Sequence, residues 1–513
     1  MSYGEIRCHI CGVSFNIGRI RTSNEPFSAG WHGLLYPTHG YVPSPENQND
    51  FCPSDAGCLL YSRFLHMLEN SSEDFKMLSQ HINPKHPPSE GQLIWGRPRF
   101  EHIAGGLGCK LNSICPEYAG YNGHAISAED MKSCNTLQCL ILKNPQWRAE
   151  PGDQDFEMNG HYFLSGLTEA VPTRHSADTQ VFPVRHGMSS PHADNIMWLP
   201  DEDQEYVMPF HPTCLEVFKR ASLHRHGRID IDGLADWWAL EATYDEFHRF
   251  PRHPAVSWEE VWRHKDGDEF LAANPCFITQ LPTILETASR IGHKTVDDSC
   301  AFAVDGISNS LTDVFSQLPW ELRAQILLEL GSQDVANLRL ASRTFRHLPQ
   351  SFFRSHTLRH MPWLWEAWST LDYSFWATTT ANDLKFKKQS QRERLADLQI
   401  AIDALTEEAT YVTTPAPYLS FNKTDWYRLR YELARNQSQL LGLKNRQRIW
   451  KDCEEILDRI GRYRREGKIV AGQRVDPQAT AQAYFNEERR RNRAWAAYCE
   501  AGRHGDFSVD DWA

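Results

Sequence analysis

The stretch that decides the fold reads QLPWELRAQILLELGSQDVANLRLASRTFR and runs from Gln317 to Arg346. Pro319 suits the first turn of a helix because its missing N–H is not needed there, and Gly331 suits the C-terminal cap of that helix. Ser332 can then cap a second helix. The spacing therefore predicts two short helices that pack against each other as a hairpin.

The apolar residues of both helices recur every three or four residues, which places them along one side of each helix. They are Leu322, Ile326, Leu327 and Leu330 in the first helix, and Val335, Leu338, Ala341 and Phe345 in the second. The hairpin contact uses only part of this surface, so the rest of the chain or a partner must cover the remainder. That remainder comprises Leu318, Leu327, Leu340 and Leu348.

The order of these residues resembles an F-box, the helical module by which a receptor subunit binds the Skp adaptor of a cullin-RING ubiquitin ligase. The pattern is Leu-Pro, Glu-Leu two residues on, Ile-Leu-x-x-Leu, Asp-Val-x-x-Leu-x-x-Ala-Ser and Phe-x-x-Leu-Pro, between Asp313 and Pro349. The resemblance implies that hydrophobic positions of the motif bind the adaptor or hold the module together. These positions are Leu318, Pro319, Leu322, Ile326, Leu327, Leu330, Val335, Leu338 and Phe345.

The module departs mildly from its relatives, since Trp320 is bulky and the motif lies in the middle of the chain. The whole arrangement is similar to large fungal F-box proteins with an N-terminal Cys-x-x-Cys. This resemblance implies a cullin partner, reached through the adaptor, and a protein client that the sequence does not identify.

The 513 residues fall into three regions that differ in composition and hydrophobic periodicity. Residues 1–310 carry short apolar runs broken by turn signals, which predicts irregular α+β structure. Residues 311–360 form the F-box-like region, and residues 361–513 are predicted to be mostly helical. The helical stripes in this last part are Leu395, Leu398, Ile402 and Leu405, then Ile449, Ile456 and Ile460. The expected fold class is α+β with several domains.

Charge is distributed unevenly along the chain. Residues 1–310 hold 40 acidic and 24 basic residues, and the whole chain carries a net charge of −12. An acidic body repels phosphate backbones, so nucleic acid is not the expected ligand. The C-terminal stretches LKNRQRIWKD and NEERRRNRAWAAY place basic residues beside tryptophan, but nearby glutamates balance them. We expect these stretches to form solvated helix faces.

The sequence shows no apolar run long enough for a membrane span and no secretory signal, which predicts a cytoplasmic or nuclear location. In such a reducing setting, 13 cysteines are better interpreted as buried thiols or metal ligands than as a disulfide framework. The charge and motif patterns thus favour an intracellular interaction protein.

The sequence CHICG at residues 8–12 has the form of a zinc knuckle, in which Cys8 and Cys11 bind one metal ion. A second ligand pair is needed, and His211 with Cys214 stands just ahead of a predicted helix, as in a treble-clef layout. One structural zinc ion is therefore expected. The rival second pairs are Cys52/Cys58, Cys109/Cys115 and Cys134/Cys139.

Two further functions compete with a ligase receptor that has no active site of its own. The first is a zinc-stabilised scaffold in which the F-box-like hairpin is buried and recruits no ligase. The second is a histidine phosphatase that uses His186 in the sequence Arg-His-Gly. A second Arg-His-Gly at residues 225–227 argues that the tripeptide occurs by chance.

Overall fold

The computed structural model confirms the general α+β class. It describes residues 7–31, 34–35, 56–62, 100–109, 120–143, 145, 147–149, 152–169, 207–241, 250–256, 264–290, 313–381, 383–384, 413–470, 472–475, 490 and 493. Among these residues, no helix combines the length and the apolar character that a membrane crossing requires. The predicted helical stripe from Leu395 to Leu405 lies outside the described residues.

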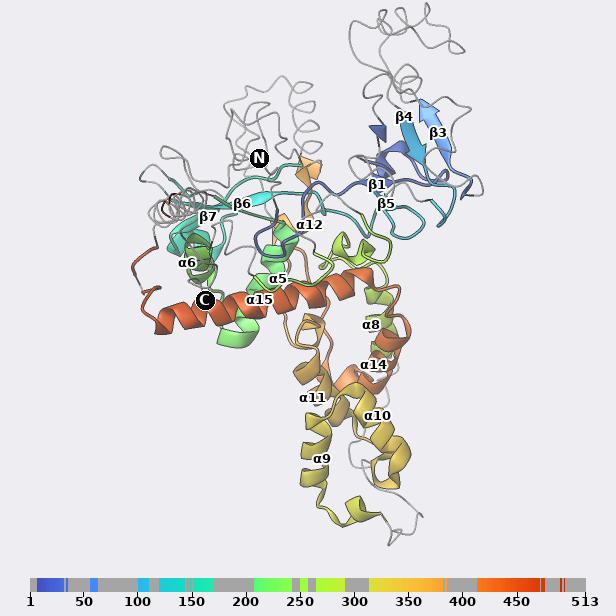
Figure 1. The fold of residues 1–513 in the computed structure, drawn as a ribbon. Helices are drawn as coiled ribbons and strands as arrows, with labels where there is room; N and C mark the ends of the chain where they lie inside the picture. Colours follow the sequence, from blue (N-terminus) through green and yellow to red (C-terminus); the bar gives the residue numbers. More distant parts are fainter. Residues whose placement is uncertain are drawn as a thin grey trace, which may run out of the picture.

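The strands form three small sheets (Figure 1). In the first, β1 (Arg19–Ile20) pairs in parallel with β5 (Tyr121–Asn122). In the second, β4 (Phe100–Ile103) lies antiparallel between β2 (Leu34–Leu35) and β3 (Leu59–Ser62). In the third, β6 (Gln138–Leu142) lies antiparallel between β7 (Tyr162–Leu164) and β8 (Val207–Phe210).

The described helices fall into three groups along the chain. Before residue 310 they are η1 (Phe27–Ala29), α4 (Asp155–Asn159), α5 (Pro212–His226), α6 (Ile231–Glu241), η6 (Glu269–Leu271) and α8 (Leu281–Arg290). The central group is η9 (Val314–Gln317), α9 (Trp320–Glu329), α10 (Ser332–Ala341), η10 (Arg343–Phe345) and α11 (Gln350–His360). The last are η11 (Trp365–Ala367), α12 (Phe375–Thr378), η13 (Phe421–Lys423), α14 (Trp426–Arg435) and α15 (Leu441–Arg465).

Helix α15 joins the C-terminal part of the chain to the N-terminal part. It runs along α5 and α6 and packs against both (Figure 1). Ile449, Ile456 and Ile460 are buried, as the predicted stripe requires. The same hydrophobic core includes Phe15 from the N-terminal part, so residues from both ends of the sequence build it together.

The expectation of a solvated basic face on α15 is wrong for the residues near its start. Arg446 and Arg448 are buried, and so is Trp450. The guanidinium of Arg446 donates to both carboxylate oxygens of the buried Glu366, at 3.0 and 2.9 Å. Such a buried pair is tolerated because each charge has an opposite partner and further hydrogen bonds.

Helices α9, α10 and α11, with η9 and η10, form a helical arm (residues 313–360) that projects from the rest of the molecule (Figure 1). The predicted hairpin boundaries are shifted by a residue or two. Helix α9 ends at Glu329, and Leu330 is its C-cap. Gly331 has φ −67° and caps the start of α10 instead of the end of α9, so Ser332 is the first residue of the second helix.

One aspartate links the segments that flank the two helices of the arm's hairpin, η9 before α9 and η10 after α10. The Asp313 side chain accepts hydrogen bonds from the backbone N–H of Phe315 and from the hydroxyl groups of Ser342 and Thr344. Burial raises the pKa of Asp313, but these hydrogen bonds outweigh it and hold the pKa below its usual value. The carboxylate thus fixes η9 to η10.

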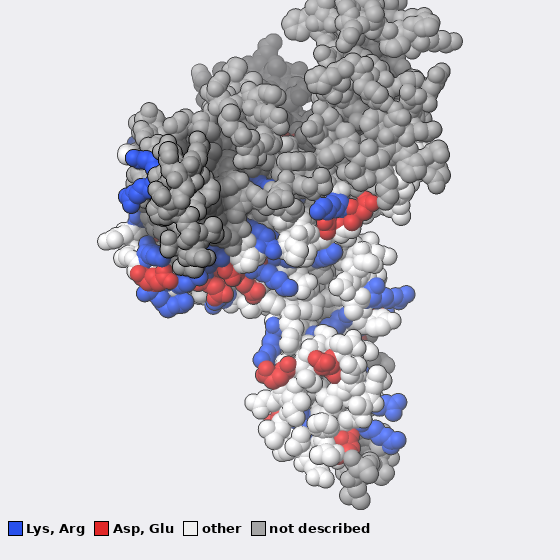
Figure 2. Space-filling view, in the orientation of Figure 1, with Lys and Arg blue, Asp and Glu red and all other residues white. Residues whose placement is uncertain are grey.

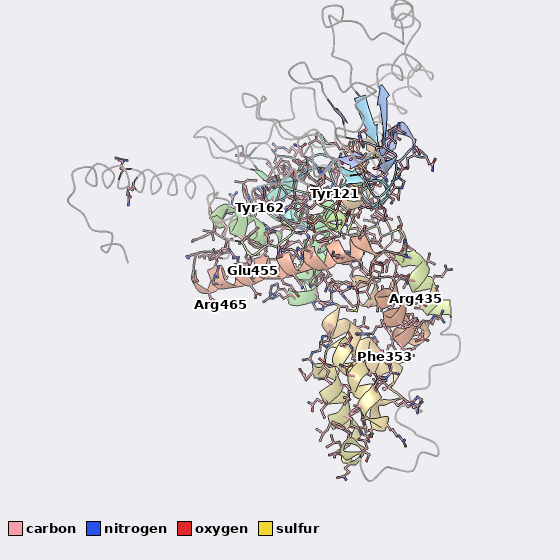
Figure 3. All side chains as sticks on the ribbon, turned by 45° about the vertical axis from the view of Figure 1, so that its right-hand side comes forward. Tyr121, Tyr162, Phe353, Arg435, Glu455 and Arg465 are labelled. Atoms are coloured by element: carbon pink, nitrogen blue, oxygen red, sulfur yellow. The ribbon has the colours of Figure 1, made fainter. Side chains whose placement is uncertain are left out.

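Contacts between α11 and α14 join the arm to the rest of the molecule. Phe353 of α11, labelled in Figure 3, packs its ring 5.0 Å from that of Tyr427 of α14, centroid to centroid. The carboxamide oxygen of Gln350 accepts from the backbone N–H of Trp426 at 2.8 Å. His356 donates from Nε2 to the Leu330 carbonyl at 2.8 Å and accepts at Nδ1 from Arg430. His356 thus links α9, α11 and α14.

We expect this joint to weaken as the pH falls from about 6.5 towards about 4. Burial, then the charge of Arg430, lowers the pKa of His356 from 6.5 to about 4, and His360 and Arg359 act in the same direction. Between these values the unfolded chain binds the proton and the folded chain does not, so stability rises with pH. The contribution of neutral His356 is complete above pH 6.5 and is lost on acidification.

Denaturant titrations between pH 4.5 and 7.5 would measure this effect. The His356→Gln variant should lose part of the wild-type pH dependence. His347→Gln, at an exposed position on the same arm, is the matched control and should follow the wild type. Parallel pH profiles for the wild type and His356→Gln would contradict the interpretation.

Candidate metal centre

The first half of the site is a tight turn between two bridged residues, Arg7 and Ser14. The backbone N–H of Gly12 donates to the Cys8 carbonyl at 2.7 Å, and Gly12 has φ +75°, which glycine adopts without strain. The N–H of Cys11 points at the Cys8 Sγ, at 3.4 Å. The turn thus brings both thiols to one side, as the knuckle pattern predicts.

The second half of the site is the start of helix α5. His211 is its N-cap residue, Pro212 occupies the first turn, and Cys214 follows within that turn. The N–H of His211 also points at the Cys8 Sγ, at 3.4 Å. The His9 N–H donates to the Pro209 carbonyl at 2.9 Å, which fixes the turn against the strand that leads into α5.

The structure brings Cys8, Cys11, His211 and Cys214 together, with all four ligand atoms within 4.8 Å of one another. The His211 Nδ1 lies 3.6 Å from the Cys11 Sγ and 3.7 Å from the Cys214 Sγ. A tetrahedral ion with metal–sulfur bonds of about 2.3 Å and metal–nitrogen bonds of about 2.0–2.1 Å separates these atoms by about 3.6 Å. The group could therefore hold a metal ion.

Because the four side chains are buried, ionising their thiols without a cation costs free energy. Burial raises the pKa of Cys214 well above its usual value, and the neighbouring Cys11 and Cys8 raise it further. Burial also opposes ionisation of Cys11, but hydrogen bonds from Cys214, Cys8 and His211 outweigh it and lower that pKa. The His211 pKa rises to about 10, because the Cys8 charge overcomes the effect of burial. A bound metal ion would displace the protons of Cys214 and His211.

Two arginines that the sequence did not point to donate hydrogen bonds to backbone carbonyls of the turn that carries Cys8 and Cys11. The Arg448 Nη1 donates to the Cys11 carbonyl at 2.8 Å, and the Arg252 Nη2 donates to the His9 carbonyl at 3.0 Å. Both guanidinium groups lie 3.3 Å from the Asp452 carboxylate. Burial raises the Asp452 pKa to about 6, although the two arginines oppose it. Helix α15 therefore positions the ligands of the candidate metal centre.

The rival cysteine pairs do not join this group within the described part of the chain. Cys58 and Cys109 belong to a separate group, with His102. Cys134 and Cys139 are free thiols whose pKa values burial raises, that of Cys134 to about 12. The remaining rivals, Cys52 and Cys115, lie outside the described residues.

The predicted adaptor-binding residues on the arm differ in their exposure to solvent. Leu327, Val335 and Phe345 are buried. Pro319 and Leu322 are exposed. The half-buried residues are Leu318, Ile326, Leu330 and Leu338. The sequence did not separate these roles, because the same three- and four-residue spacing holds for core and surface positions.

Further apolar side chains on the arm are exposed, namely Trp320, Val314 and Leu340, at 59%, 73% and 89% of their surface. The face of the arm seen in Figure 2 carries few charged side chains. The arm therefore presents apolar groups to solvent at several positions near the start of α9 and on α10.

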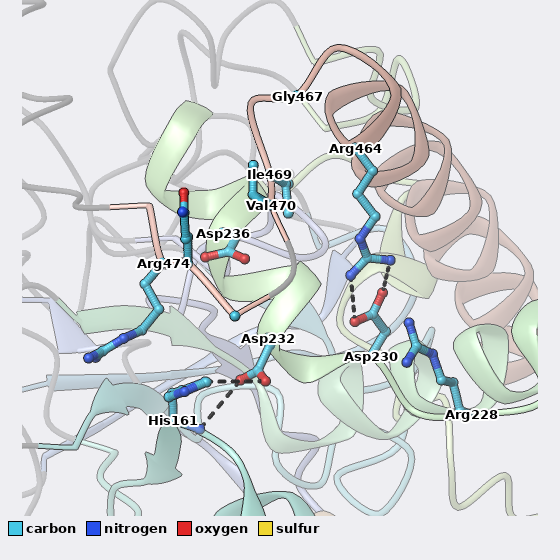
Figure 4. A pocket seen from close by; sticks show the side chains of 12 residues that line it. His161, Arg228, Asp230, Asp232, Asp236, Arg464, Gly467, Ile469, Val470 and Arg474 are labelled. Carbon is cyan, nitrogen blue, oxygen red and sulfur yellow. Dashed lines mark hydrogen bonds and ion pairs between the residues drawn. The ribbon is translucent and has the colours of Figure 1, made fainter.

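A separate pocket of about 560 Å³ lies where the end of α15 meets α6 (Figure 4). Asp230 accepts two hydrogen bonds from Arg464, at 2.6 and 2.9 Å, and Asp232 lies 3.5 Å from His161. Asp236 accepts from the Val475 N–H at 3.2 Å. All three carboxylates bind groups of this chain, which is a structural arrangement.

The phosphatase candidate His186 lies outside the described residues. The other Arg-His-Gly sequence, residues 225–227, ends helix α5, with Gly227 as a left-handed cap at φ +68°. A helix cap explains that tripeptide without catalysis.

No family model matches the chain, and no solved structure matches it. A stretch of 50 residues is 42% identical to a part of the mitochondrial ATP-dependent RNA helicase mss116 of Aspergillus oryzae. The match covers 10% of this chain and spans only 8% of the length of the helicase.

Proposed function

We propose that the protein is a substrate-receptor subunit of a Skp-cullin-F-box ubiquitin ligase. The arm would bind the Skp adaptor, and through it a cullin, in the cytoplasm or nucleus. Another surface would hold a protein client, whose lysines then receive ubiquitin because the ligase raises their effective concentration. Such a receptor needs no active site of its own.

The observation that carries this proposal is the exposed apolar surface of the arm. Trp320 and Leu322 are exposed at the start of α9, at 59% and 46% of their surface. Both lie inside the F-box-like motif, beside the Leu-Pro pair that opens it. Aromatic and large apolar side chains of this kind commonly dominate the energy of a protein interface. The experiment is therefore adaptor capture by the wild type and by a Trp320→Ala/Leu322→Ala variant.

The candidate metal centre would contribute a structural zinc ion to this receptor. Three thiolates and one imidazole suit zinc, and four protein ligands leave no open position for a reacting water molecule. The ion would fix the N-terminal turn to α5. It would thereby stabilise the part of the molecule from which the arm projects.

The second candidate is an interaction scaffold that recruits no ligase. Burial of both Leu318 and Leu327 would favour it, and the structure buries Leu327 completely but leaves Leu318 half-buried. The same adaptor experiment distinguishes the two candidates. Folded wild-type protein that never captures the adaptor supports the scaffold.

A further inference from the structure

A second group of metal-ligand side chains lies, in sequence, between the two halves of the first. The ligand atoms of Cys58, His102 and Cys109 are all within 4.8 Å of one another. The Cys109 Sγ lies 3.3 Å from the His102 Nε2. This distance is a few tenths of an ångström below the sulfur–nitrogen separation of about 3.6 Å at a regular tetrahedral zinc ion.

The strand register explains why Cys58 and His102 meet. Strand β3 is antiparallel to β4, and Leu60 is paired with His102. Side chains alternate between the two faces of a sheet, so the position two residues before Leu60 shares a face with His102. That position is Cys58, one residue before β3 begins. The two side chains are therefore diagonal neighbours on one face.

A glycine-rich loop brings the third ligand back to the same place. Gly105 packs so closely on Gly57 that a Cβ at residue 105 would come within 2.2 Å of the Gly57 carbonyl. The backbone N–H of Cys109 donates to the Gly106 carbonyl at 3.2 Å and closes the turn. Glycine at residue 105 thus allows the segment that follows His102 to contact the backbone just before Cys58.

Burial argues against a catalytic cysteine–histidine pair. The side chains of Cys109 and His102 are only 2% and 3% exposed, so a substrate could not reach the sulfur. A nucleophile would also have no use for the second thiol at Cys58. Two thiols and one imidazole around a common point are instead the donor set that selects zinc.

We infer that Cys58, His102 and Cys109 form a second zinc site, which holds the start of β3 to β4 and to the loop that follows β4. The three described ligands leave one position of a tetrahedron. Gly105, Leu107 and Gly108 of the adjoining loop are exposed, and Cys58 is half-exposed. This site goes beyond the proposed function and does not depend on adaptor binding.

Metal counting on the purified full-length chain tests this inference. The wild type should carry about two zinc ions per chain, and Cys109→Ser and Cys58→Ser should each carry about one. Cys134→Ser is the matched control at a free thiol outside both groups, and it should keep the wild-type content. The ion that remains at Cys8, Cys11, His211 and Cys214 also reports that the variant has folded. A Cys109→Ser chain with the wild-type zinc content overturns the second site.

A measurement on the wild type avoids any folding defect of the variants. The half-exposed Cys58 should resist a thiol-alkylating reagent while zinc is bound and become modified after a chelator is added, as read by peptide mass spectrometry. Alkylation at the same rate before and after chelation overturns the inference. So does a disulfide between Cys58 and Cys109 in the purified protein.

Discussion

The Trp320→Ala/Leu322→Ala variant is expected to lose about a thousandfold in affinity for the Skp adaptor. Each side chain would behave as an interface hot spot worth about 2 kcal/mol, and the sum of about 4 kcal/mol corresponds to that factor. Because both side chains are exposed, at 59% and 46% of their surface, their truncation should leave the melting temperature nearly unchanged. Affinity would be measured with purified adaptor by calorimetry or biosensor.

Two further variants make this experiment decisive. Met158→Ala removes another exposed apolar side chain, on α4 and outside the arm, and should bind the adaptor like the wild type. Leu327→Ala truncates a fully buried residue and should cost about 2–5 kcal/mol of folding stability. Wild-type affinity in the double variant, or a wild-type chain that is folded yet binds no adaptor, would remove the F-box proposal.

Replacing Cys8 by serine is expected to remove one zinc ion per chain and to destabilise the N-terminal part far more than the arm. Structural zinc contributes apparent binding free energies of about 10–16 kcal/mol in zinc-finger peptides, where folding and binding are one process. The loss here should be smaller, because the surrounding core also contributes to stability. It should still lower the melting temperature by many degrees.

Metal analysis and thermal unfolding would measure the two parts of this prediction. Cys214→Ser should behave like Cys8→Ser, since both residues belong to one group. Cys134→Ser provides the control for a thiol that lies in neither group. Full zinc content in the Cys8→Ser and Cys214→Ser variants, with unchanged melting temperatures, would be inconsistent with the proposed centre.

Short-range patterns in the sequence predicted those features that depend on neighbouring residues. The helical period between Pro319 and Phe345 located two helices of the arm, and the Cys-x-x-Cys and His-x-x-Cys spacings located both halves of the candidate metal centre. The errors at Gly331 and Ser332 are boundary errors, because several residues of a turn can serve as a cap. The division at residues 310 and 360 stays a prediction.

Features that depend on contacts between distant residues could not be predicted in this way. Arg446 and Arg448 resemble surface residues in sequence, and only the packing of α15 against the N-terminal part reveals their buried partners. His102 was missed for a similar reason, since its meeting with Cys58 depends on the register between β3 and β4. Cys58 and Cys109 were noticed, but only as rival ligands for the first centre.

The contact between Arg448 and the Cys11 carbonyl also has a consequence for synthesis on the ribosome. The two residues are 437 positions apart, so the N-terminal turn is made long before the helix that supports it. At translation rates of about 5–20 residues per second, the wait is about 20 to 90 s. During this interval the turn lacks its contact with α15, and we expect a nascent chain in this state to bind chaperones. A chain truncated before α15 would never form this contact.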